Sequence, residues 1–372
     1  MKVRYSKPEP CGSKQSKQKR TMKKTKIVAK EKDLYAAVDL HSNNGFYCVI
    51  DEKDQIVFSK RLPNDLKTVT DALEPFRERL VKGVAVESTF NWYWLVDGLQ
   101  DKGYTMQLVN TTKVQTYSGL KQSDDKSDAF HLAHLQRLNL LPTGYIFPKE
   151  LRGARDMLRR RMLLVQQRTA QVLSFKSLVE RDTGENISTA KIKALEAEDV
   201  NQVLDGTESV LMGQANVRMI GAFDEEIAKL EKGAKARLKL LPDYQRLKEI
   251  PGVGEILNLV IMLETGPIER FASAGNYTSY CRAVKSVKIS NEKKKGENNR
   301  KCGNKYLAWA YVEAANFAIR YDSKIQMWHQ RKLKRCGGKS AVAIKALAAK
   351  LSKAAYYMLK NKEAFKTEKL FG

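Results

Sequence analysis

The stretch Leu34-Tyr-Ala-Ala-Val-Asp-Leu40 decides the fold of the N-terminal part of this 372-residue chain. Its apolar residues are almost continuous, which is typical of a strand that is buried on both faces. Two further runs, residues 45–50 and 55–60, follow after short polar turns. Closely spaced apolar runs of this length predict a meander of three strands.

Helices and strands alternate after this meander. Apolar spacing predicts helices over residues 65–80, 92–99 and 127–138 and strands over residues 84–87 and 106–109. Three hairpin-linked strands followed by alternating helices and strands predict a mixed sheet flanked by helices, which is an α/β fold.

The rest of the chain is mainly helical by pattern. Apolar residues seven apart predict one seam of a coiled coil, formed by Leu151, Leu158, Val165, Val172 and Val179. A second helix with periodic apolar residues follows after a polar stretch at residues 182–184. The expected organisation is a disordered basic arm (1–32), an α/β domain (33–147), an all-α coiled-coil arm (148–240), a mainly helical C-terminal domain (241–330) that includes a Lys-rich loop (285–305), and a basic helical tail (331–372).

The chain carries 67 Lys and Arg against 42 Asp and Glu, a net charge of +25. Nucleic acid is the expected polyanionic partner, because each phosphate contact releases counterions; an acidic membrane surface is the lesser possibility. A mean hydropathy of −0.48 and the absence of an apolar run long enough for a span predict no membrane segment. Five cysteines without a C-x-x-C pair fit a reducing cytoplasm. The residues expected to contact nucleic acid are Arg159, Arg160, Arg161, Gly252, Gly254, Lys293, Lys294, Lys295 and Arg300.

Four carboxylates stand at positions that suggest chemistry. Asp39 and Glu87 end predicted strands, and Asp125 and Asp128 open a predicted helix three residues apart. Oxygen ligands gathered in this way hold Mg²⁺ or Mn²⁺ in phosphoryl transfer. Structural roles stay open, because Asp125 could instead cap the helix. His41, just after Asp39, is a candidate for orienting a substrate phosphate.

These residues carry a resemblance to a known family. Val38-Asp39-Leu40, Val86-Glu87-Ser88 and Ser123-Asp-Asp-Lys-Ser-Asp-Ala129 resemble the acidic motif of DEDD insertion-sequence transposases. Pro251-Gly-Val-Gly254, Gly303-Asn304 and Val312-Glu-Ala-Ala315 resemble the C-terminal transposase domain of that family, which is related to Piv-type invertases. The resemblance covers residues 33–320 and implies a RuvC-like, RNase H-like sheet in the N-terminal domain.

The resemblance also implies an activity and its residues. Asp39, Glu87, Asp125 and Asp128 would bind Mg²⁺ or Mn²⁺, and a serine of the C-terminal domain would attack a DNA phosphate. Ser290 matches that serine, although Asn291-Glu292 replace the usual glycines, which leaves Ser286 as a rival. The family further implies double-stranded DNA as substrate and a guide RNA. Exchange between two duplexes needs four strand cuts, which predicts a dimer or tetramer. The expected location is the bacterial cytoplasm, at the nucleoid. A RuvC-like nuclease with a metal-activated water and a non-catalytic architectural DNA-binding protein are the alternatives.

Overall fold

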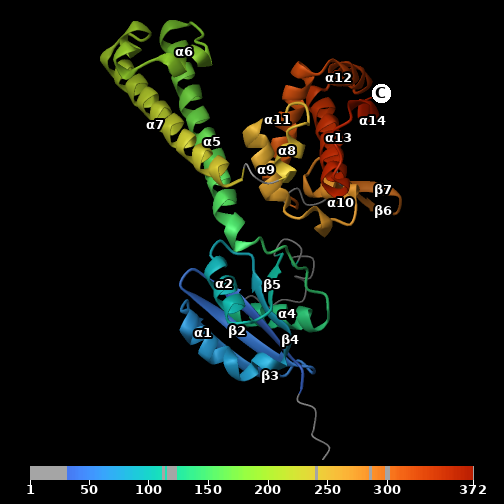
Figure 1. Ribbon diagram of the computed structural model, residues 1–372. Helices are drawn as coiled ribbons and strands as arrows, with labels where there is room; N and C mark the ends of the chain where they lie inside the picture. The colour runs from blue at the N-terminus through green and yellow to red at the C-terminus, as the bar shows by residue number, and fades with distance from the viewer. Residues whose placement is uncertain are drawn as a thin grey trace, which may run out of the picture. The chain divides into compact units, whose positions relative to one another are not determined.

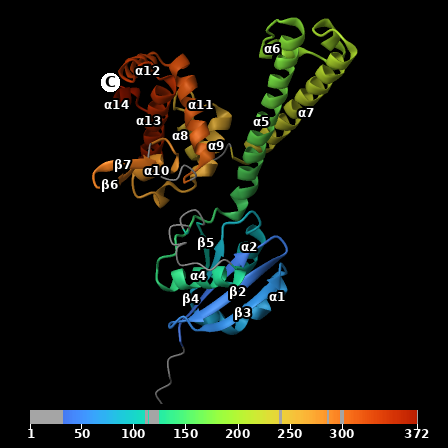
Figure 2. The same cartoon turned by 180° about the vertical axis from the view of Figure 1, so that it is seen from behind.

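The computed structural model describes residues 32–110, 114, 124–238, 242–284, 287–297 and 302–371. The expected basic arm therefore lies outside the described residues except for Lys32. The chain divides into two compact units (Figures 1 and 2). The first comprises residues 1–107 and 120–141, and the second comprises residues 108–119 and 142–372.

The first unit is built on one five-stranded sheet. Its strands are β1 (Leu34–Leu40), β2 (Asn44–Asp51), β3 (Ile56–Pro63), β4 (Leu80–Glu87) and β5 (Met106–Val109), in the order β3-β2-β1-β4-β5. Strand β2 runs antiparallel to β1 and β3, whereas β4 runs parallel to β1. The mixed α/β class is confirmed, and the strand arrangement is consistent with an RNase H-like domain.

Two helices follow the meander. Helix α1 (Leu66–Leu73) is capped by the side chain of Asp65 and continues as the 3₁₀ helix η1 (Glu74–Arg79). The predicted single helix over residues 65–80 is thus interrupted, because Pro75 removes a backbone donor. Helix α2 (Tyr93–Asp101) lies between β4 and β5 in the chain and packs on α1.

Helix α4 (Asp125–Arg137) packs across β1 and β2 and is fixed at its C-terminal end. Asp54, in the β2–β3 turn, accepts hydrogen bonds from Arg137 and lies 2.9 Å from Nδ1 of His134. Lys82 of β4 donates to the carbonyl oxygens of Gln136 and Arg137. These contacts give His134 a structural role and hold the C-terminal end of α4 on the sheet.

Two long helices of the second unit pack antiparallel. Helix α5 (Lys149–Thr183) ends at Gly184, and α7 (Thr207–Leu238) returns along it. The connection is longer than the predicted polar stretch, because it contains α6 (Thr189–Ala194) and the 3₁₀ helix η3 (Ala197–Gln202). Phe175 is fully buried where these elements meet. The coiled-coil assignment of this arm stays a prediction.

The remaining elements of the second unit form a helical bundle. They are α8 (Pro242–Leu247), α9 (Glu255–Thr265), η4 (Ile268–Arg270), α10 (Ala274–Tyr280), β6 (Val287–Ser290), β7 (Lys293–Glu297), α11 (Lys305–Tyr321), α12 (Ser323–Arg335), α13 (Ser340–Asn361) and α14 (Thr367–Phe371). Helices α9, α11 and α13 share one apolar core. The segment expected as a basic tail is helical but belongs to this core, since Leu347, Leu351 and Tyr356 are buried. Among the described residues, no helix has the length and apolar character that a bilayer crossing requires.

Candidate functional site

Parallel pairing places two of the predicted acids side by side. Val38 of β1 faces Val86 of β4, so the next residues along these strands are Asp39 and Glu87. Neighbouring strands lie about 5 Å apart, and residues at equivalent positions point to the same face. Asp39 is only 6% exposed. The C-terminal ends of β1 and β4 therefore carry adjacent carboxylates.

The start of α4 separates the roles of two consecutive acids. Asp124 is the N-cap, and its carboxylate accepts a hydrogen bond from the backbone of Ser127 in a capping box. The hydrogen bond from Ser127 lowers the pKa of Asp124. Asp125 is the first helical residue and is not the cap, which removes the capping role considered for it; Asp128 follows one turn later.

Asp39 and Asp125 meet around the ring of His41. Nε2 of His41 lies 3.2 Å from Oδ2 of Asp39 and 3.3 Å from Oδ1 of Asp125. One potential ligand atom from each residue lies within 4.8 Å of the other two. Glu87 and Asp128 are not members of this three-residue group in the part of the chain that the structure describes.

Arg61 of β3 holds the second oxygen of Asp125. Its guanidinium lies 2.5 Å from Oδ2, and this hydrogen bond lowers the pKa of the Asp125 carboxyl group. Strand register explains the approach, because Asp39 faces Phe46 on β2 and Phe46 faces Arg61 on β3. The sequence interpretation missed Arg61, and the pairing of the three strands is the signal that could have found it.

The donor set fits one divalent cation. An ion with ligand bonds of about 2.1 Å in octahedral geometry places adjacent ligand atoms roughly 3 Å apart. The distances from His41 to Asp39 and Asp125 are close to that separation. Two more acids could add carboxylate ligands. Glu87 lies beside Asp39, and Asp128 lies one helical turn beyond Asp125.

The proposed serine lies on a β-hairpin in the second unit. The predicted Lys-rich loop forms β6 and β7, in which Ser290 faces Lys293 across a two-residue turn. Both turn residues, Asn291 and Glu292, have positive φ. Ser290, Lys293 and Lys295 are exposed, whereas Ser286, Arg300 and the side chain of Lys294 lie outside the described residues.

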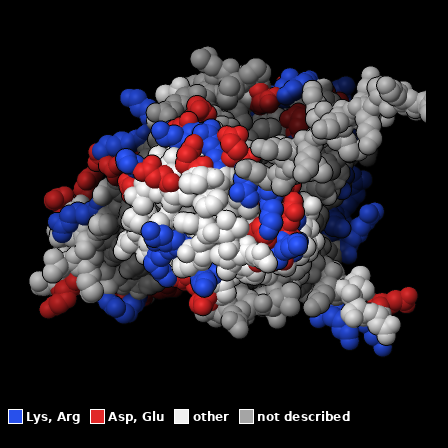
Figure 3. Space-filling model, turned by 90° about the horizontal axis from the view of Figure 1, so that it is seen from below, with Lys and Arg blue, Asp and Glu red and all other residues white. Residues whose placement is uncertain are grey.

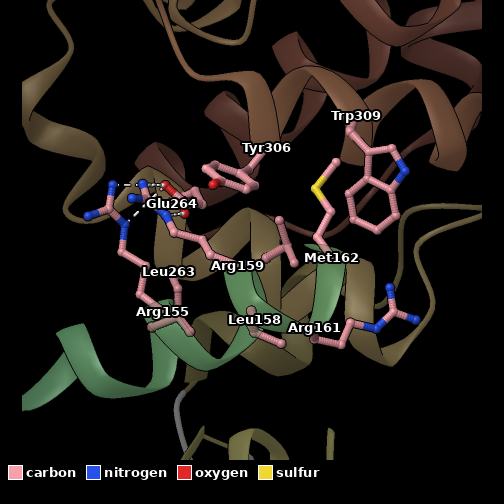
Figure 4. A pocket seen from close by; sticks show the side chains of 10 residues that line it. Arg155, Leu158, Arg159, Arg161, Met162, Leu263, Glu264, Tyr306 and Trp309 are labelled. Atoms are coloured by element: carbon pink, nitrogen blue, oxygen red, sulfur yellow. Dashed lines mark hydrogen bonds and ion pairs between the residues drawn. The ribbon is translucent and has the colours of Figure 1, made fainter. Parts of the chain in front are cut away.

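The arginines at the start of α5 are mostly engaged within the protein. Arg155 and Arg159 converge on the carboxylate of Glu264, which is 2% exposed (Figure 4). Arg161 pairs with Glu231 of α7 at 2.8 Å. Arg160 is exposed. The acids that balance Arg159 and Arg161 come from α9 and α7, which are distant in the sequence.

Charges are mixed on the face that Figure 3 shows. Lys and Arg side chains alternate there with Asp and Glu around an uncharged area. The net charge of +25 is thus not gathered into a single basic patch on that face.

Gly252 is required by the packing of its turn. Its φ is +82°, and a Cβ atom there would lie 2.2 Å from the carbonyl oxygen of Ala314 and 2.5 Å from the nitrogen of Ala318 in α11. Gly254 differs, because it is the exposed N-cap of α9 and a Cβ atom would meet nothing within 4 Å. The close approach of this turn to α11 explains why residue 252 is glycine, and a phosphate contact is not needed to explain it.

Replacing Gly252 with Ala is expected to destabilise the second unit by about 3 kcal/mol or more, from left-handed backbone strain and from overpacking. The matched change Gly254→Ala should cost less than about 1 kcal/mol. Chemical denaturation of both variants, followed by hydrogen exchange in α9 and α11, measures the difference. Equal stability of the two variants would contradict the close approach.

Two family models and one known transposase match this chain. Residues 36–181 match a family model of DEDD transposases of the IS110 type. Residues 244–330 match a model described as the transposase IS116/IS110/IS902 family. The transposase for insertion sequence element IS1111A of Coxiella burnetii (strain RSA 493 / Nine Mile phase I) is 23% identical over 361 residues, which cover 94% of each chain. With both domains matched in the same order, the chain belongs to the IS110 family of DEDD insertion-sequence transposases.

Proposed function

We propose that this transposase cuts and rejoins DNA by metal-assisted transesterification. The approach of Asp39 and Asp125 to within reach of one cation, although they are far apart in the sequence, carries the proposal. Asp39, Glu87, Asp125 and Asp128 are the proposed carboxylate ligands. A bound Mg²⁺ or Mn²⁺ would neutralise negative charge on the DNA phosphate and on the leaving oxygen.

Ser290 is the proposed nucleophile. Its exposed position at the end of β6 leaves the hydroxyl accessible to a substrate. The bond from its oxygen to phosphorus forms as a phosphodiester bond of the DNA breaks, and the DNA hydroxyl leaves with the proton. The phosphate ester so formed keeps the bond energy, so a second DNA hydroxyl can reverse the step and join a new strand without ATP.

Double-stranded DNA from the element ends and the target is the proposed substrate, and a guide RNA is the proposed second nucleic acid. The net charge of +25 supports polyanion binding, and a folded RNA can be held through its shape and backbone. Among the residues predicted to contact nucleic acid, Arg160, Lys293 and Lys295 have exposed side chains in the part of the chain that the structure describes. Exchange between two duplexes needs several cuts, which supports a dimer or tetramer.

A covalent-adduct assay tests the nucleophile. The full-length protein, with the element's non-coding RNA, is incubated with DNA from the element ends and Mg²⁺, and protein-linked DNA is isolated under denaturing conditions. Peptide mapping is expected to place the adduct on Ser290. Ser290→Ala should abolish the adduct, whereas Ser286→Ala should retain it.

Other outcomes assign other functions. A nuclease that uses a metal-bound water would be favoured by two results together: the Ser290→Ala protein still cuts DNA, and the unsubstituted protein forms no adduct. An adduct on a residue other than Ser290 would overturn the assignment of the nucleophile and leave transesterification in place.

A further inference from the structure

We propose that His41 is a nitrogen ligand of the catalytic cation and that it shifts the selectivity of the site from Mg²⁺ toward Mn²⁺. The inference rests on the metal site of the proposed function and adds a ligand that is not one of its four carboxylates. It starts from the position of His41 Nε2, which lies 3.2 Å from Asp39 and 3.3 Å from Asp125.

Both backbone polar groups of His41, its N–H and its carbonyl oxygen, are hydrogen-bonded. Its N–H donates to the carbonyl oxygen of Asn44 at 2.8 Å. Its carbonyl oxygen accepts hydrogen bonds from the side chains of Asn64 at 3.0 Å and Asn91 at 2.8 Å. Three segments of the first unit thus hold the backbone of His41 directly after β1. This fixes the position from which the imidazole side chain extends.

The two oxygens of Asp125 have separate contacts. Oδ2 faces Arg61, and Oδ1 faces Nε2 of His41. Arg61 is itself held, because its other terminal nitrogen donates to Asn44 at 2.8 Å and its guanidinium lies 5.8 Å from the ring centroid of Phe46. Outer contacts of this kind orient metal ligands. Asp125 therefore presents one oxygen, on the side where His41 and Asp39 lie.

The chemistry of imidazole sets the selectivity. Mg²⁺ prefers oxygen ligands and keeps much of its water. Mn²⁺ also takes oxygen ligands, but as a first-row transition-metal ion it accepts an imidazole nitrogen more readily than Mg²⁺ does. A site with two carboxylate oxygens and one imidazole nitrogen in mutual contact should therefore bind Mn²⁺ more tightly than an all-oxygen site would.

Electron paramagnetic resonance of bound Mn²⁺ tests the ligand directly. In the full-length protein, pulsed spectra should show coupling of Mn²⁺ to a directly bound nitrogen. His41→Ala should remove this coupling and weaken Mn²⁺ binding by roughly tenfold, while Mg²⁺ binding, measured by competition, changes less than about twofold. His134→Ala is the matched control, because that ring is in the same unit but contacts Asp54, and it should retain the coupling.

The outcomes separate the ligand from the site. Mn²⁺ that binds without nitrogen coupling, or with coupling that persists in His41→Ala, overturns the role of His41 and leaves an oxygen-ligated metal site. Mn²⁺ binding that is absent, or unchanged by Asp39→Asn, overturns both the inference and the proposed metal site.

Discussion

Asp39→Asn is expected to lower DNA cleavage and joining by at least about a thousandfold, because a catalytic cation contributes several kcal/mol of transition-state stabilisation. The substitution keeps the size of the side chain but removes the charge that faces His41 at the end of β1. Rates are measured as the formation of joined product and of protein-linked DNA over a range of Mg²⁺ and Mn²⁺ concentrations.

Asp51→Asn provides the matched control. Asp51 is also buried, and it ends β2 at the opposite end of the β1–β2 ladder, where it faces Leu34. The hydrogen bond from Lys32 is the largest cause that lowers the pKa of Asp51 to about 2, so Asp51 is ionised in the folded protein. Its replacement should change the rate only a few-fold. An Asp39→Asn protein with unchanged DNA-dependent activity would instead support an architectural role.

Glu264→Ala is expected to destabilise the second unit by about 3–5 kcal/mol, because it leaves the buried Arg155 and the partly buried Arg159 without their counter-charge. Glu264 of α9 accepts hydrogen bonds from Arg155 and Arg159 of α5 and, at 2.7 Å, from Asn304, which also caps α11. Three helices thus depend on one carboxylate. The loss is measured from hydrogen exchange in α9 and α11 as a function of denaturant.

Acid should act on the same carboxylate. Burial by itself would raise the pKa of Glu264, but the hydrogen bond from Arg159 and the charges of both arginines hold it below the usual value. Because the folded pKa is lowered, this contribution to stability is present above the unfolded pKa of about 4.3 and is lost as the pH falls through the folded pKa.

The control for Glu264 is Glu231, which is more accessible than Glu264 and pairs with Arg161. Glu231→Ala should destabilise the second unit less than Glu264→Ala, because it removes the counter-charge of one arginine rather than of two. A Glu264→Ala protein that is no less stable than Glu231→Ala would show that the bundle does not depend on this carboxylate.

Elements with strong apolar patterns were predictable from the sequence. The bounds of β1 and β5 agree with the prediction, because continuous apolar runs specify buried strands. The hairpin of β6 and β7 was expected as a loop instead. Strand β7 begins with three consecutive lysines, and the turn contains Asn291-Glu292 rather than the Asn-Gly that usually marks such turns.

The candidate site was predictable only in part. The acids could be named because strand ends and helix starts are local features. The contacts of Asp125 with Arg61 and His41 depend on the register of three strands and on how α4 lies across them, which spacing does not reveal. The partners of Arg159 and Arg161 come from α9 and α7, far along the chain, so their pairing could not be anticipated.

The two-residue turn beside Ser290 has a consequence for how this hairpin can evolve. Side chains of a strand alternate between its two faces. Inserting or deleting one residue within the paired part of β6 would therefore turn the Ser290 hydroxyl to the opposite face of the hairpin. A length change of two residues would keep the Ser290 hydroxyl on the same face and would change only how far the hairpin extends. Natural variation in the length of β6 is therefore expected to favour even steps, whereas β7 already carries one extra residue opposite the step from Lys288 to Ile289.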